Sequence, residues 1–198
     1  TPGTYTNTVQ ASSNTLRGTA TVVVTVGPLA SLVVTPNPQT LIVRATQQFV
    51  AVGKDAGGNT VPIVVTWSVV ALGGTIDGGG LFTAGSAPGT FTNTVKATSG
   101  SMSATATIIV TDGPVFTITV TPNPATMVVN STQQMTAVGK DIAGNVVVIA
   151  PVWSVATTPN GASITQTGMY TAGTVAGTFT NKVRARFNNI DGFATIIA

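Results

Sequence analysis

The feature that most constrains the fold of this chain is an internal repeat. Residues 27–110 return as residues 113–198, with matching positions 86 residues apart. A two-residue insertion after the second tryptophan makes the offset 88 from there on. The segments Val-Thr-Pro-Asn-Pro at 34–38 and 120–124, and Trp-Ser-Val at 67–69 and 153–155, show the match most clearly. Two copies of one unit predict two domains with one fold, so the 198 residues are not one large domain.

Residues 1–26 match the end of the same unit, since Pro-Gly-Thr-Tyr-Thr-Asn-Thr-Val at 2–9 parallels residues 88–95. Two paired strands cannot bury an apolar face alone. We therefore expect residues 1–26 to be the closing two strands of a preceding domain, followed by domains at 27–112 and 113–198. The residues expected to pair with that preceding domain or with another chain are Tyr5, Val9, Ala20, Val22 and Val24.

Two routes could complete this opening hairpin. Its strands could insert into another subunit, or the rest of its domain could belong to the same, longer repeating chain. We favour the second route, because the second full repeat already has its own last two strands. The expected partners are flanking repeats or other copies of the chain.

The composition predicts an all-β fold. Only 7% of residues are charged and 43% are hydrophobic, with valine and threonine recurring along strand-length segments. Each unit holds about seven such segments separated by turn residues, the pattern of an antiparallel Greek-key sandwich. Pro36 and Pro38 are expected to divide the first strand into two pieces, because proline cannot donate to a ladder.

Alternation along the strands assigns the core. In the penultimate strand Phe91, Asn93 and Val95 should face inward, while Thr92, Thr94 and Lys96 should face outward. Trp67 and Trp153 are the expected centres of the two cores. The full set of expected core residues is Trp67, Trp153, Phe49, Phe91, Phe179, Asn93 and Asn181.

These residues resemble the group 2 bacterial immunoglobulin-like domains found in tandem in bacterial surface adhesins and phage structural proteins. The resemblance covers the whole chain. It is carried by Thr-Gln-Gln-Phe at 46–49, the Gly-x-Asp-x-x-Gly-Asn turn at 53–59, Thr-Trp-Ser at 66–68 and Gly-Leu-Phe-Thr-Ala at 80–84. It implies immunoglobulin-like sandwiches that act as spacers or adhesive modules, with no fixed catalytic residues to transfer.

The chain lacks the usual side chains of catalysis and cofactor binding. It has no His, Cys or Glu, so acid-base and thiol chemistry have few candidate groups, and we expect no enzyme and no cofactor. A net charge of +3 without basic clusters argues against nucleic acid. No apolar run is long enough to insert into a membrane as a helix.

The aspartates near glycine have two readings. Side-chain bonding to the turn backbone is the simpler one. The alternative is calcium held by Asp55, Asp112 or Asp141, although Ca²⁺ takes six to eight oxygen ligands and Asp112 stands alone at its joint. Asn7, Asn93 and Asn181 recur at an inward strand position, where the simpler expectation is a hydrogen bond across the sandwich to loop backbone. The alternative is an isopeptide bond to Lys54 or Lys140.

Two surface patterns remain. Threonines at spacing two, such as 90, 92 and 94, suit strand propensity, and O-glycosylation is one alternative. Ice binding is another, but it needs a flat surface that strand twist disfavours. Lys182, Arg184 and Arg186 alternate on one strand and predict a solvated, aggregation-blocking face. The alternative is contact with an acidic surface glycan or a neighbouring chain.

The short joints at 26–28 and 111–114 each contain a proline, which predicts restricted hinge motion. Together these features indicate a semi-rigid structural repeat of an extracellular or cell-surface bacterial fibre, filament or adhesin stalk. The alternative function is a receptor- or glycan-binding adhesin module.

Overall fold

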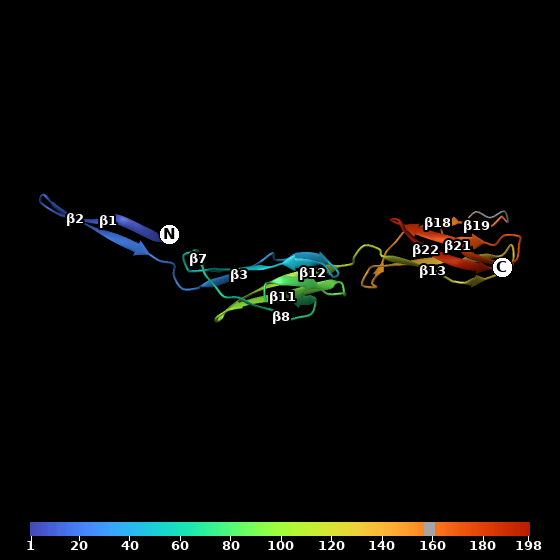
Figure 1. Ribbon diagram of the computed structural model, residues 1–198, viewed down its shortest axis with the longest axis horizontal. Coiled ribbons are helices and arrows are strands. Elements are labelled where there is room, and N and C mark those ends of the chain that lie inside the picture. The colour runs from blue at the N-terminus through green and yellow to red at the C-terminus, as the bar shows by residue number, and fades with distance from the viewer. Residues whose placement is uncertain (157–160) are drawn as a thin grey trace. The chain divides into compact units, whose positions relative to one another are not determined.

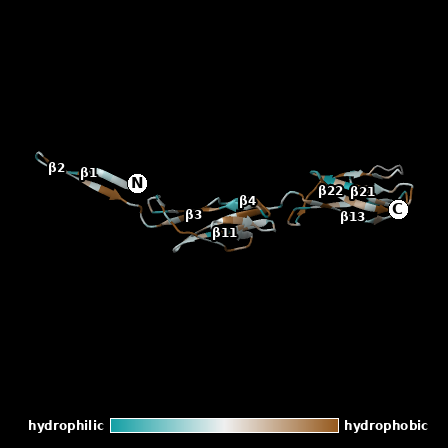
Figure 2. Cartoon of the chain, viewed as in Figure 1, coloured by the Kyte–Doolittle hydropathy of each residue, from teal (hydrophilic) through white to brown (hydrophobic). Residues whose placement is uncertain are grey.

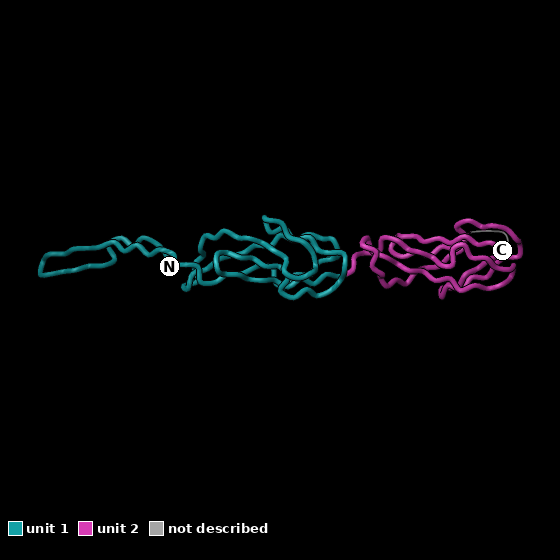
Figure 3. The backbone as a smooth tube through the Cα atoms, turned by 90° about the horizontal axis from the view of Figure 1, so that it is seen from below, with its two compact units in different colours: residues 1–111 teal, residues 112–198 magenta. Residues whose placement is uncertain are grey.

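The computed structural model describes residues 1–156 and 161–198. They form two compact units, Thr1–Thr111 and Asp112–Ala198 (Figure 3). The regular secondary structure of the described residues consists entirely of β-strands, which confirms the predicted all-β class. None of the described residues belongs to a helix long and apolar enough to span a membrane. The expected domain boundaries at 26 and 112 stay a prediction.

Unit 1 opens with a hairpin of two long antiparallel strands, β1 (Gly3–Ser13) and β2 (Leu16–Val24) (Figure 1). Every residue of both strands is exposed. The end of β2 is strongly apolar, as its brown colour in Figure 2 shows. The two strands form a sheet of their own.

The rest of unit 1 is a sandwich. One layer is a four-stranded sheet of β4 (Gln39–Ile42), β12 (Met102–Thr111), β11 (Gly89–Ser99) and β8 (Thr66–Val69). The other layer has two small sheets: β3 (Ser31–Thr35), β6 (Val50–Lys54) and β7 (Thr60–Val61), then β5 (Thr46–Gln48), β10 (Leu81–Ala84) and β9 (Gly74–Ile76).

Unit 2 has the same topology. Its four-stranded sheet is β14 (Ala125–Thr126), β22 (Ile190–Ile197), β21 (Thr178–Phe187) and β18 (Val152–Val155). Its small sheets are β13 (Thr117–Thr121), β16 (Thr136–Lys140) and β17 (Val146–Val147), then β15 (Thr132–Gln134), β20 (Met169–Thr171) and β19 (Ser163–Ile164).

The strands are shorter and more numerous than about seven per unit because some change sheets midway. The proline segment ends β3, which pairs antiparallel with β6, and the chain resumes as β4, which pairs parallel with β12. Between the two prolines, the Asn37 side chain donates to the Thr105 carbonyl (3.2 Å) and accepts from the Thr107 N–H (3.0 Å). The asparagine amide thus supplies the hydrogen bonds that proline cannot.

The two cores are mainly apolar, and several of their largest buried side chains lie in or next to the strands of the smaller sheets. In unit 1 Phe49 and Phe82 are almost fully buried and meet edge to face, with ring centroids 6.0 Å apart. In unit 2 the corresponding positions hold Met135 and Tyr170, which are also buried. The remaining buried apolar residues of unit 2 are Ile118, Val120, Ala125, Trp153, Ala172, Val183, Ala185, Ala194 and Ile196.

The two tryptophans differ. Trp153 is buried, whereas Trp67 is only half-buried, so the prediction that Trp67 is the centre of the first core is wrong. Trp67 lies at the margin of the core, against Gly80, where a Cβ would come 3.0 Å from its indole ring. Phe91 and Phe179 are also half-buried rather than central.

A bulge interrupts the penultimate strand and changes which residues face inward. The pairing of β11 with β12 shifts between Phe91 and Val95, and Asn93 takes a φ of +54° within that shift. Asn93 is therefore exposed and Thr94 is fully buried, the reverse of the prediction. Asn181 sits in the same way, exposed, with a φ of +50°.

Candidate functional site

Each unit contains a turn in which one aspartate collects several N–H donors. Asp55 accepts from the backbone N–H groups of Gly57 (2.9 Å) and Asn59 (2.8 Å) and from the Asn59 side chain. It also accepts from the N–H of Gly27 in the joint before the sandwich, at 2.9 Å. Hydrogen bonds from the Asn59 side chain and the Gly27 backbone lower the pKa of Asp55 to about 2.

Asp141 repeats this arrangement in unit 2. Its carboxylate accepts from the N–H groups of Ala143 and Asn145, from the Asn145 side chain, and from the N–H of Gly113 at 3.1 Å. Burial alone would raise the pKa of Asp141, but the bonds from Asn145 and Gly113 outweigh it and lower the pKa to about 2. We call the two arrangements, Gly27–Asp55–Asn59 and Gly113–Asp141–Asn145, the joint clamps.

The joint clamps use the aspartates as acceptors of N–H groups, as expected of structural turns. Asp112 is exposed. Among the described residues there is no group of three or more acidic, His or Cys side chains that could hold a metal ion. Calcium at Asp55, Asp112 or Asp141 therefore has no assembled ligand set in this part of the chain.

The isopeptide hypothesis also lacks its geometry. Lys54, Lys140, Asn93 and Asn181 are all exposed, whereas such a bond needs buried partners. The Asn93 side chain is instead used locally, because its carbonyl oxygen accepts from the Thr105 hydroxyl at 3.1 Å.

Lys182 does not lie on a basic surface. It follows the bulge asparagine and occupies the place of Thr94, so it is almost fully buried, and its inclusion in an exposed basic face is wrong. Its ammonium donates to the Ala156 carbonyl at 2.9 Å and lies 5.8 Å from the Phe179 ring centroid. Burial lowers the pKa of Lys182.

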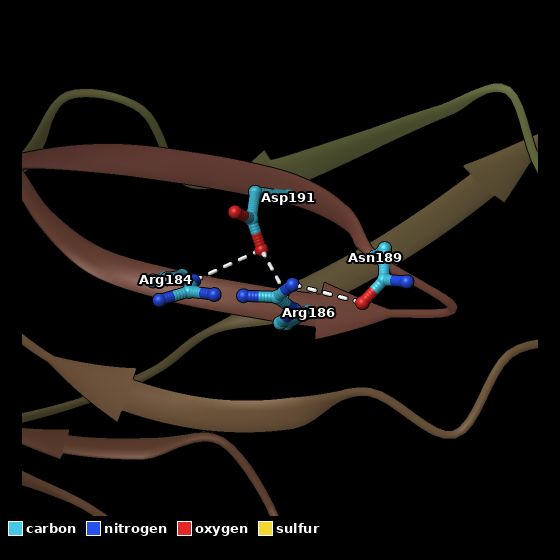
Figure 4. A network of polar contacts seen from close by, with 4 residues as sticks. All are labelled: Arg184, Arg186, Asn189 and Asp191. Carbon is cyan, nitrogen blue, oxygen red and sulfur yellow. Dashed lines mark hydrogen bonds and ion pairs between the residues drawn. The ribbon is translucent and has the colours of Figure 1, made fainter.

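Arg184 and Arg186 do share one face of β21, where they surround Asp191 of β22 (Figure 4). Arg184 forms an ion pair with Asp191 at 2.9 Å, and Arg186 is 3.8 Å from the same oxygen. Arg186 also donates to the Asn189 side chain at 2.9 Å. Both guanidinium groups are thus held by the hairpin rather than free in solution.

Next to these arginines the same sheet exposes two large apolar side chains. Phe193 pairs with Arg184 across the strands and is 41% exposed, and Val152 pairs with Arg186 and is 62% exposed. We call Val152, Arg184, Arg186, Asp191 and Phe193 the outer face of unit 2. Unit 1 has Thr66, Lys96, Thr98, Ser103 and Thr105 at these positions. The repeat alignment contained this difference, but the aromatic member was not predicted.

Comparison with known protein sequences gives a partial match. No family model matches the chain. Ice-binding protein 1 of Shewanella frigidimarina is 35% identical over 134 residues, which cover 66% of this chain and 15% of that protein. The chain thus spans only a small part of this curated relative.

Two solved structures share the architecture. The Escherichia coli adhesin FdeC superposes with a TM-score of 0.51 at 21% identity, covering 91% of this chain and 69% of that one. Protocadherin gammaB7 EC3-6 gives a TM-score of 0.54 at 19% identity, covering 100% and 58%. These likenesses confirm the class of immunoglobulin-like β-sandwiches. Membership of the bacterial group 2 family stays a prediction.

Proposed function

We propose that this chain is a structural repeat of an extracellular or cell-surface bacterial fibre, filament or adhesin stalk, acting as a semi-rigid spacer. The observation that carries the proposal is the joint clamp. Both sandwiches have one, in the same position, and each ties the glycine of the preceding joint to a loop of the sandwich that follows.

A clamp of this kind favours a fixed direction of entry into each sandwich. The acceptor is a charged carboxylate, which makes a stronger hydrogen bond than a neutral acceptor. Proline follows each clamped glycine, as Pro28 and Pro114, and its ring fixes φ. The free torsions of the joint are therefore few, which is what a spacer needs and a hinge does not.

Distance measurement between two spin labels tests the proposal. The chain has no cysteine, so Thr92→Cys and Thr180→Cys, both at exposed sites, give a unique labelled pair. A spacer predicts a narrow distance distribution that Asp141→Ala broadens, with Asp77→Ala, outside the joints, as the control. A broad distribution in the parent chain, unchanged by Asp141→Ala, would contradict the proposal.

One observation favours a second candidate, a receptor- or glycan-binding adhesin module. The outer face of unit 2 combines two arginines with an exposed aromatic ring, a composition enriched at binding hot spots. A screen against acidic glycans tests this candidate. Binding that Phe193→Thr together with Arg184→Thr abolishes, and Lys96→Thr leaves unchanged, would place the binding candidate ahead of the spacer.

The name of the Shewanella relative raises ice binding for this chain. A flat row of threonines would be needed, and in the complete unit the bulge turns Thr94 inward, between Thr92 and Lys96. The spacer proposal instead assigns the matching segment to connection within a larger protein. Thermal hysteresis measured with the isolated chain would contradict that assignment.

A further inference from the structure

The β1–β2 hairpin is built in the same register as the two closing strands of the complete sandwich. Both pairs contain a shift at an asparagine of positive φ, Asn7 at +56° and Asn93 at +54°. In each, the asparagine carbonyl oxygen accepts from a threonine hydroxyl, Thr19 at 2.9 Å and Thr105 at 3.1 Å. The matching pairs are Tyr5↔Val22 with Phe91↔Ile108, and Val9↔Ala20 with Val95↔Ala106.

The apolar face of the hairpin is uncovered where its counterpart is buried. Val9, Val22 and Val24 are 54%, 39% and 41% exposed. Their counterparts Val95, Ile108 and Val110 are 0%, 0% and 2% exposed. Such a row of exposed valines on paired strands is unfavourable in water and marks a surface made for contact.

The complete sandwich shows what covers this face. Beyond β12 lies β4, in parallel, and the asparagine between the prolines bonds to the carbonyl of Thr105 and the N–H of Thr107. The corresponding backbone groups of the hairpin belong to Thr19 and Thr21. Beyond β11 lies β8, with Trp67 opposite Ala97. The corresponding residue of the hairpin is Ala11.

We infer that the hairpin is the docking surface for the front part of a third sandwich of this repeat type, supplied by the same polypeptide. A segment with Pro-Asn-Pro lies in parallel beside β2, its asparagine bonded to Thr19 and Thr21. A tryptophan strand lies antiparallel beside β1. On docking, the Thr8 hydroxyl leaves the Tyr5 carbonyl, to which it now donates at 2.9 Å, and turns inward as Thr94 does.

A second copy of the chain is a poorer occupant. In units 1 and 2 the front strands are already paired with their own closing strands, β11–β12 and β21–β22. A second copy therefore offers no vacant front, and insertion would require one of its sandwiches to open. This inference does not depend on the spacer proposal, because it concerns how residues 1–26 are completed.

The test joins a front to the intact chain. Residues 28–87 are placed directly before residues 2–198, so that Ala87 precedes Pro2 in the order that Ala87 precedes Pro88. The inference predicts that amide exchange in β1 and β2 slows by roughly 1000-fold or more, because the strands enter a cooperatively folded domain. Val22→Asp should reverse this slowing in the extended chain and leave exchange in the parent chain unchanged.

Two results would overturn the inference. One is fast exchange of the hairpin amides in the extended chain, equal to that of the parent. The other is a parent chain that sediments as a dimer with its hairpin already protected, because a second copy would then be the occupant. A monomeric parent with fast exchange, together with a protected hairpin in the extended chain, supports it.

Discussion

Asparagines at positive φ decide which side chains enter the core of each sandwich. An asparagine tolerates the left-handed region better than other residues with a side chain, so Asn93 and Asn181 can absorb the extra residue of the bulge. The next residue then points inward. It is Thr94 in unit 1, whose hydroxyl donates to the Ala71 and Leu72 carbonyls, and Lys182 in unit 2.

The buried ammonium of Lys182 gives unit 2 a pH dependence of stability. Burial lowers the pKa of Lys182 in the folded state below 10.5, the ordinary value of a lysine. Between the two pKa values the unfolded state binds more protons than the folded state, so the stability of unit 2 increases as pH rises through this range. We expect Lys182→Thr to stabilise unit 2 at pH 7, with an advantage that shrinks towards pH 10. Urea unfolding at the two pH values measures it.

Tyr170 also titrates at high pH, but its effect cancels when the two variants are compared. Burial raises its pKa, so its titration destabilises the fold at high pH, but equally in both variants. The difference between the variants therefore isolates Lys182. A difference that is independent of pH would mean that the amine is not penalised by burial.

The joint clamps predict a second, acidic dependence. The pKa of Asp55 is lowered in the folded state from its ordinary value of 3.8 to about 2. The ionised carboxylate therefore stabilises the fold fully above pH 3.8, and this stabilisation disappears as pH falls through 2. Asp55→Asn should lower the Tm of the first sandwich at pH 7 and have no effect below pH 2. Asp112→Asn removes the same charge at an exposed site and should leave the Tm unchanged at both.

These residues show what the sequence could predict and what it could not. Strict alternation correctly places Val95 and Ala97 inward, after the bulge, but it cannot place Asn93 and Thr94 because a bulge adds one residue to the count. The repeated asparagine was a visible signal. An asparagine indicates a bulge only when its φ is positive, and the sequence does not show φ. The wrong prediction that Lys182 faces outward has the same cause.

Among the strands of unit 1, Gly80 marks a close backbone approach within the layer of small sheets. Gly80 has a φ of +86°, and its N–H and carbonyl lie in the turn before β10, where the carbonyl accepts from the Phe49 N–H at 2.8 Å. A Cβ there would lie 2.8 Å from the Phe49 carbonyl oxygen. The proline break of the first strand was predictable, whereas the sheet change at Phe49 was not, since no proline or glycine marks it.

Gly80→Ala should therefore destabilise the first sandwich by more than about 1 kcal/mol, because the strained φ and the close contact act together. Gly58→Ala is the matched control, since Gly58 also has a positive φ, +81°, but open space around the added Cβ. It should cost only the backbone part, about 1 kcal/mol. Equal losses in urea unfolding would show that the contact with Phe49 is irrelevant.

For the whole molecule, the sequence predicted the type of fold, because each copy of the repeat carries its own strand pattern and turns. The outer face of unit 2 arises where the second copy departs from the first, and the sequence indicated its arginines but not Val152 and Phe193. Both units keep the joint clamp, whereas only unit 2 has the outer face. A tandem spacer whose modules are locally specialised would show this combination.

The spacer proposal is tested most directly by how length grows with repeat number. X-ray scattering would compare the full chain with chains extended after Ala198 by one and two further copies of residues 111–198, so that each new joint keeps Thr111 and Asp112. Clamped joints predict that the maximum dimension rises by the same increment with each copy. An increment that falls with each copy, as in a string of freely jointed domains, would contradict the account.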